Sequence, residues 1–111
     1  MEYRRLGKSG LHISELSFGS WITFGNQIGD NTSENLMAMA YDAGINFFDN
    51  AEVYAGGKSE EVMGQILQKM NWSRDSYLVS SKVYFGKMGL KDSKPTQKGL
   101  NRKHIVEACE Q

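Results

Sequence analysis

The chain has 111 residues, 40% of them hydrophobic, and its 13 basic and 13 acidic residues give a formal net charge of zero. This composition is typical of a globular chain rather than a disordered one, and the balanced charge gives no electrostatic signature of nucleic-acid or anionic-membrane binding. No segment approaches the roughly 20 apolar residues of a membrane-spanning helix, and the single cysteine, Cys109, excludes an internal disulfide.

The first elements expected along the chain are extended. Residues 3–6 and 11–13 flank the Gly-rich segment 7–10, a pattern that predicts a β-hairpin. Residues 16–19 are a short strand-like run, and a polar, Gly-containing loop is expected to follow it as far as Asp30.

A helix is expected after this loop, capped by Asn31, Thr32 or Ser33, with Glu34 in its first turn and Gly44 at its C-terminal end. Its apolar residues recur at helical spacing, and they are Leu36, Met37, Met39, Ala40 and Ala43. Residues 45–49 then predict a second strand.

The same pattern of loop, helix and strand is repeated once. After the Gly-rich loop at 55–57, Ser59 is expected to cap a second helix, and residues 77–82 predict a third strand. The apolar stripe of the second helix is Val62, Met63, Ile66, Leu67 and Met70. A polar loop is expected over 83–99.

The last predicted element is a helix that begins after Asn101, its expected cap. Ile105, Val106 and Ala108 are expected to face inward. His104 is expected at the surface or half-buried, without a catalytic role.

Strands and helices that alternate at this spacing predict a parallel sheet with crossover helices. A doubly wound sheet would have a tight Gly-rich turn after its first strand. Here the loop that begins with residues 19–25 is long and contains aromatic residues. The pattern therefore favours a (β/α)8 barrel, of which residues 1–111 supply the hairpin and about three βα units. Since such a barrel needs about 250 residues, we expect a single partial domain that is truncated at its C-terminal side; a chain that needs a partner, or a compact three-layer domain, is the alternative.

Three polar side chains are expected to meet where the strands end. Asp49 ends the second strand, Tyr54 follows five residues later, and Lys82 ends the third strand. A tyrosine hydroxyl can protonate a carbonyl that accepts hydride, a nearby ammonium lowers the phenol pKa, and a carboxylate balances the lysine. The three residues therefore predict a proton-transfer site, with Tyr54 as general acid. No cluster of His, Cys, Asp and Glu has metal-ligand spacing.

Several motifs in order resemble the aldo-keto reductase family. Residues 49–54 (DNAEVY) resemble its D-x-A-x-x-Y signature, residues 57–64 resemble its G-x-S-E-x-x-x-G run, and Lys82 ends a strand as in the family. The segments 3–11 and 17–21 also match. Residues 21–27 and 99–105 look most like the branch that contains voltage-gated potassium channel β subunits.

The resemblance implies NADPH as hydride donor and a small aldehyde or ketone as substrate. Asp49, Tyr54 and Lys82 would be three members of a catalytic tetrad, whose fourth member would be a histidine at the end of a fourth strand. Ser20, Trp21 and Gln27 would lie near the nicotinamide, and Asp49 would also contact the cofactor.

Three functions remain open. The parent protein is expected to reduce carbonyl compounds, with this chain alone inactive; alternatively it is a regulatory binding protein like the channel β subunits, or a non-functional truncated remnant. A cytoplasmic location is expected, without nucleic-acid binding or membrane insertion, and the full-length form is expected to form a homo-oligomer or to bind a membrane channel.

Overall fold

The computed structural model describes residues 1–111 and contains two small sheets. Strands β1 (Tyr3–Arg5) and β2 (His12–Ser14) form an antiparallel hairpin, which confirms the first prediction. Strands β3 (Phe18–Gly19), β4 (Phe47–Asp49) and β5 (Leu78–Ser80) form a parallel sheet in that order. The chain is therefore a mixed α/β structure with parallel crossovers, as the alternating pattern predicted.

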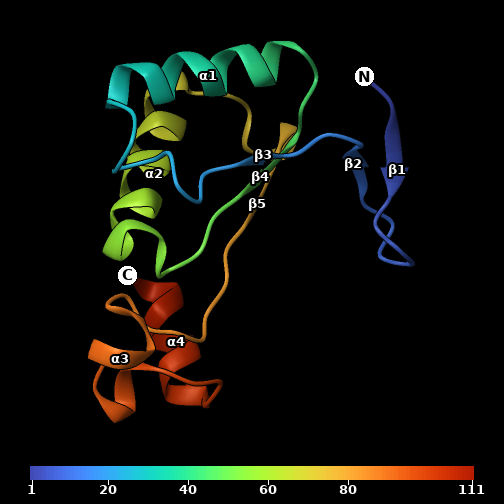
Figure 1. Ribbon diagram of the computed structural model, residues 1–111. Coiled ribbons are helices and arrows are strands. Elements are labelled where there is room, and N and C mark those ends of the chain that lie inside the picture. Colours follow the sequence, from blue (N-terminus) through green and yellow to red (C-terminus); the bar gives the residue numbers. More distant parts are fainter.

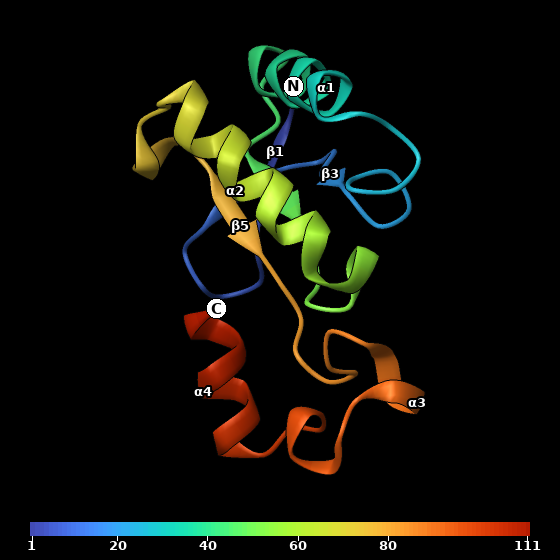
Figure 2. The same ribbon diagram turned by 90° about the vertical axis from the view of Figure 1, so that its left-hand side faces the viewer.

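Two helices cover one face of the parallel sheet. Helices α1 (Asp30–Asp42) and α2 (Lys58–Met70) lie on the same side, and the hairpin lies on the other side (Figures 1 and 2). The buried cluster between helices and sheet consists of Phe24, Met37, Phe48, Val62, Met63, Ile66 and Tyr77. Phe48 is at its centre, because its ring lies within 6.0–6.2 Å of the rings of Phe18, Trp72 and Tyr77.

The stripe predicted for α2 is confirmed, whereas the stripe predicted for α1 is wrong in part. Met37 and Ala40 are buried, but Leu36 and Met39 are 40% and 68% exposed. The predicted caps are wrong for both helices: α1 begins after Gly29 and α2 after Gly57, and neither has a side-chain cap. Ser33 and Ser59 lie inside the helices and are fully buried; the Ser33 hydroxyl donates to the Gly29 carbonyl and the Ser59 hydroxyl to the Ser20 carbonyl.

The C-terminal segment forms a separate lobe below the sheet (Figure 1). The predicted loop contains a short helix α3 (Gly89–Asp92) and a 3-10 turn (Pro95–Gln97), and α4 (Arg102–Glu110) follows. Asn101 caps α4 as predicted, by accepting the His104 N–H. The inward face is wrong, however: Ile105 and Val106 are 39% and 40% exposed, and His104 is 5% exposed.

The chain is more open than its length requires. Its radius of gyration is 14.8 Å, its extents are 42 × 37 × 21 Å, and only 19 of 111 residues are buried. A compact domain of about 100 residues is expected to have a radius near 13 Å. None of the helices combines the length and the apolarity needed to cross a membrane.

Candidate active site

The parallel register brings the ends of three strands together. Gly19 pairs with Asp49, and Asp49 pairs with Ser80. Backbone hydrogen bonds continue past the strand ends, from the Glu52 N–H to the Lys82 carbonyl at 3.2 Å. Residues at one edge of a parallel sheet therefore become neighbours although up to 33 positions separate them in the chain.

Asp49 and Lys82 form a two-pronged ion pair. The Lys82 Nζ donates to both carboxylate oxygens of Asp49, at 2.8 and 2.6 Å, and to the Asn50 carbonyl at 2.7 Å. The Ser80 hydroxyl donates to the same carboxylate. All three ammonium hydrogens thus have an acceptor, which holds the lysine in one orientation although its side chain is 54% exposed.

The ion pair sets the charge of Asp49. Burial raises the pKa of this carboxyl, but the hydrogen bonds from Lys82 and Ser80 and the attraction of the ammonium outweigh it, so the pKa lies below its ordinary value of 3.8. Asp49 is therefore a carboxylate at neutral pH, and it presents a constant negative charge to Lys82.

Tyr54 lies beside this pair. The Lys82 Nζ is 5.3 Å from the centroid of the Tyr54 ring, and the Trp21 ring centroid is 6.3 Å from it. None of the hydrogen bonds within the chain uses the Tyr54 hydroxyl. Directly after Tyr54 the backbone turns sharply, with Ala55 and Gly56 both in the left-handed region.

The other predicted site residues, Ser20, Trp21 and Gln27, differ in their exposure to solvent. Trp21 is 70% exposed, and Gln27 is exposed in the loop that follows β3. Ser20 is fully buried, and its hydroxyl donates to the Asp49 carbonyl at 3.0 Å. The structure thus brings Ser20, Trp21, Asp49, Tyr54 and Lys82 together, and their contact with a cofactor stays a prediction.

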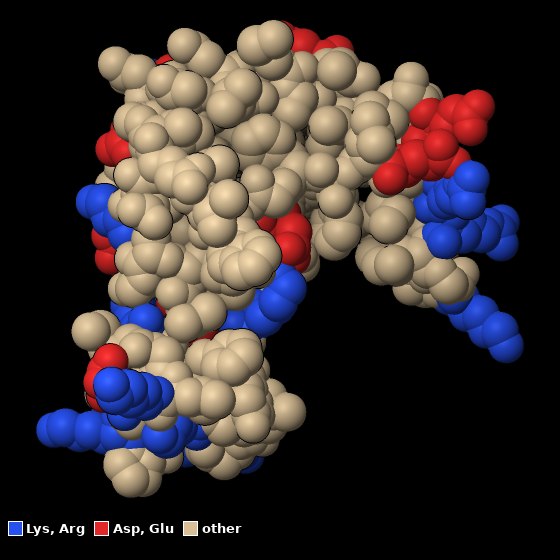
Figure 3. Space-filling model, viewed as in Figure 1, with Lys and Arg blue, Asp and Glu red and all other residues tan.

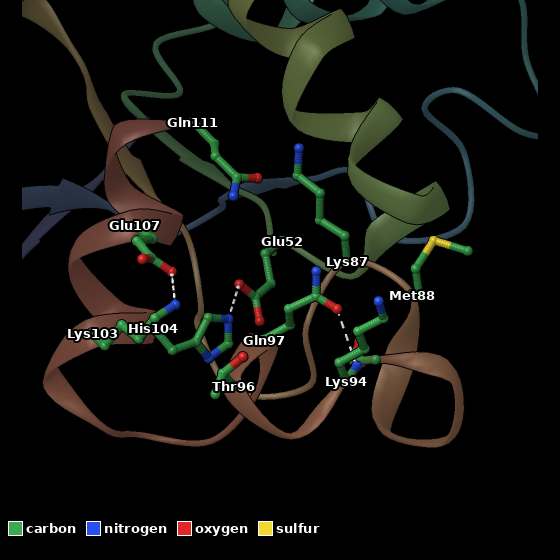
Figure 4. Close-up of a pocket in the computed structure, with 11 residues that line it drawn as sticks. Glu52, Lys87, Met88, Lys94, Thr96, Gln97, Lys103, His104, Glu107 and Gln111 are labelled. Atoms are coloured by element: carbon green, nitrogen blue, oxygen red, sulfur yellow. Dashed lines mark hydrogen bonds and ion pairs between the residues drawn. The ribbon is translucent and has the colours of Figure 1, made fainter.

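A buried pair near the site escaped the sequence analysis. The Glu52 and His104 side chains are only 5% and 7% exposed, and His104 Nε2 lies 3.1 Å from Glu52 Oε2. Figure 4 shows the two side chains pointing toward each other, and both line a pocket of about 290 Å³. The expectation that His104 lies at the surface or is half-buried is therefore wrong, because its side chain is buried. The sequence pattern did not indicate this burial. It predicted that the apolar residues Ile105 and Val106 face inward, and this placed His104 outside the predicted buried face.

The lobe around this pair is basic. Residues 87–103 contain six lysines and arginines and one acidic residue, Asp92, and blue side chains gather on the lower lobe in Figure 3. The pocket in Figure 4 is lined by Lys87, Lys94 and Lys103 together with Glu52 and Glu107. It lies to one side of the group formed by Asp49, Tyr54 and Lys82, none of which lines it.

Comparison with known proteins agrees with the geometry. The chain matches the model of the aldo/keto reductase family over residues 15–111. It is 50% identical over 107 residues to two proteins named "Probable voltage-gated potassium channel subunit beta", from Oryza sativa subsp. japonica and Arabidopsis thaliana. The match covers 96% of this chain and 31% of each relative, so the chain spans about a third of the length of these curated relatives.

Proposed function

The chain belongs to the aldo/keto reductase family, and we propose that it carries three members of an active site that reduces aldehydes or ketones to alcohols with NADPH in the whole protein. One observation carries this proposal. The Lys82 ammonium lies on both oxygens of Asp49 and 5.3 Å from the Tyr54 ring centroid.

The proposed reaction divides its work among these residues. When bound, NADPH supplies a hydride to the carbonyl carbon. The Tyr54 hydroxyl donates its proton to the carbonyl oxygen, which receives the π electrons of the C=O bond. The Lys82 ammonium then attracts the negative charge left on the phenolate oxygen, and Asp49 holds Lys82 in place.

The residues present fit a nicotinamide cofactor. The exposed Trp21 indole lies beside Tyr54 and offers a flat face for a planar ring, and Gln27 supplies a free amide on the same loop. Asp49 and Ser20 would border the same place, Ser20 mainly by supporting the Asp49 carbonyl. We propose Trp21 and Gln27 as the direct contacts.

We also propose that the 111-residue chain is inactive by itself and forms the hairpin and first three βα units of a (β/α)8 barrel. Lys82 is 54% exposed, so the site admits bulk water that would compete for the proton. The fourth tetrad member implied by the resemblance is a histidine, and neither His12 in β2 nor His104, which bonds Glu52 and Gly99, contacts Tyr54.

A second role is favoured by the relatives' names. Two proteins that are 50% identical to this chain are named as probable potassium channel β subunits. We therefore propose, as the alternative, that the whole protein is a regulatory subunit that binds a membrane channel or forms a homo-oligomer. The free, exposed Cys109 fits the reducing cytoplasm that either role would need.

The test compares the whole protein with its Tyr54→Phe variant, by following NADPH consumption with simple aldehydes and NADPH binding by Trp fluorescence. We expect NADPH to bind both proteins, and the variant to lose at least about 100-fold in turnover, the scale of a general acid. Binding without turnover in either protein would favour the channel role. Absence of NADPH binding would contradict the enzymatic role.

A further inference from the structure

Glu52 lies between two residues of the proposed site and reaches across the chain. It is three positions after Asp49 and two before Tyr54, and its side chain is 5% exposed. Its Oε1 accepts the backbone N–H groups of Tyr84 at 3.1 Å and Gly86 at 2.6 Å. The segment that leaves Lys82 is thus tied to the segment that leads to Tyr54.

The second oxygen of Glu52 is also occupied. Oε2 lies 3.1 Å from His104 Nε2, and His104 Nδ1 lies 2.8 Å from the Gly99 carbonyl. A carbonyl can only accept, so Nδ1 donates to it, and Nε2 faces the carboxylate. Since both ring nitrogens have partners, the pair is not free to act as a base on a ligand; its role is to hold structure.

The segment held by Glu52 is itself tightly packed. Gly86 is buried with φ +76°, and a Cβ there would meet Ser93 and lie 2.5 Å from the Gln97 carbonyl. The Gly99 N–H donates to the Tyr84 carbonyl at 2.7 Å. These contacts tie Tyr84 and Gly86 to residues 93–99, and Glu52 is the buried carboxylate that joins this segment to the strand ends.

We infer that Glu52 is a positioning residue, whose carboxylate fixes the chain after Lys82 so that the lysine stays on Asp49 and beside Tyr54. The catalytic meaning of this placement rests on the proposed function, but the placement itself does not. The backbone bond from the Glu52 N–H to the Lys82 carbonyl, at 3.2 Å, holds the chain at Lys82, and the side-chain bonds to residues 84 and 86 add a restraint on the chain just beyond it.

A neighbouring carboxylate provides the matched control. Glu60 accepts the hydroxyl of Ser81, next to Lys82, but this bond is exposed to solvent. An exposed hydrogen bond exchanges readily with water and restrains the chain little. If any acidic contact near Lys82 sufficed, loss of the Glu60 contact would have the same effect as loss of the Glu52 contact.

The experiment separates the effect of side-chain length at position 52 from the effect of its charge. Glu52→Gln keeps the length and loses the charge: its amide oxygen can accept from residues 84 and 86, and its NH₂ can donate to a neutral His104. Glu52→Asp keeps the charge but is one methylene too short to make all these bonds. The readouts, for the 111-residue chain, are the carboxyl titration of Asp49 and the hydrogen exchange of the Tyr84 and Gly86 amides, both by NMR, with Glu60→Ala as control.

We expect Glu52→Gln and Glu60→Ala to titrate at Asp49 as the wild type does. In Glu52→Asp, the pKa of Asp49 should rise toward its ordinary value as Lys82 leaves, and both amides should exchange at least about tenfold faster. Unchanged Asp49 titration in Glu52→Asp, or an equal rise in Glu52→Gln, would overturn the inference. If Glu52→Asp does not fold, wild-type exchange decides: protected amides at 84 and 86 support it, and unprotected ones overturn it.

Failure of this inference and failure of the proposed function are distinguishable, because neither readout needs turnover. A chain that meets these expectations while the whole protein reduces no carbonyl retains the positioning role and loses the enzymatic one. A whole protein that is active, with Asp49 insensitive to Glu52→Asp, retains the enzymatic role alone.

Discussion

The ammonium of Lys82 bridges both carboxylate oxygens of Asp49, at 2.8 and 2.6 Å, although β4 and the exit of β5 are separated by a helix. The parallel pairing of Asp49 with Ser80 makes this contact possible, because it places Lys82 two residues beyond the partner of Asp49.

The ion pair should dissociate only in acid. Burial raises the pKa of Asp49, but the bonds from Lys82 and Ser80 lower it more, to below 3.8. A depressed folded-state pKa means that the contribution to stability is present above the ordinary carboxyl pKa and is lost as pH falls through the folded-state value. We expect NMR titration of the Asp49 carboxyl to have its midpoint below 3.8; a midpoint above that value would contradict the structure.

Lys82→Met should change the pKa of Asp49 but have little effect on the free energy of unfolding. Without the ammonium, burial acts on Asp49 with less opposition, so its pKa should rise relative to the wild type. Exposed ion pairs contribute only about 0–1 kcal/mol, so the free energy of unfolding should change by no more than that. Urea denaturation and carboxyl titration measure the two effects. Lys103→Met, which breaks the exposed pair with Glu107, should leave Asp49 unchanged.

Gly86→Ala should damage the C-terminal lobe more than Gly89→Ala does. Both glycines have positive φ, +76° and +79°, so each alanine costs about 1–2 kcal/mol in backbone strain. At Gly86 the new Cβ would also collide with Ser93 and the Gln97 carbonyl, whereas nothing lies within 4 Å at Gly89. We expect an additional cost of about 1–3 kcal/mol from overpacking. Equal loss of stability in the two variants, measured by urea denaturation, would show that the packing around Gly86 is looser than described.

Asn101→Ala should weaken α4, because Asn101 Oδ1 accepts the His104 N–H at 2.9 Å. The expected cost is about 0.5–2 kcal/mol, seen as faster amide exchange in the first turn of α4. Asn31→Ala is the comparison: Asn31 was an expected cap, yet it lies inside α1, which begins at Asp30. Alanine there should be neutral or slightly stabilising, and a loss similar to that of Asn101→Ala would restore the cap predicted from the sequence.

Prediction from sequence succeeded where the pattern is local and repeated. The hairpin, the order of strands and helices, the stripe of α2 and the cap at Asn101 follow from periodicity and turn chemistry within a few residues. It failed at Leu36, Met39, Ile105 and Val106, which are apolar but exposed. Helical spacing identifies an apolar face, but which part of that face is covered depends on the neighbouring element.

By itself, the sequence determined the α/β alternation and, through several motifs in order, the family and the identity of Asp49, Tyr54 and Lys82 as candidates. Only the tertiary structure decided that Lys82 binds both oxygens of Asp49, that Ser20 faces inward, and that Glu52 and His104 form a buried pair. The reason is that these contacts join residues 29 to 52 positions apart. Their distances are set by strand register and by the packing of a lobe, and neither is encoded in the local spacing of residues.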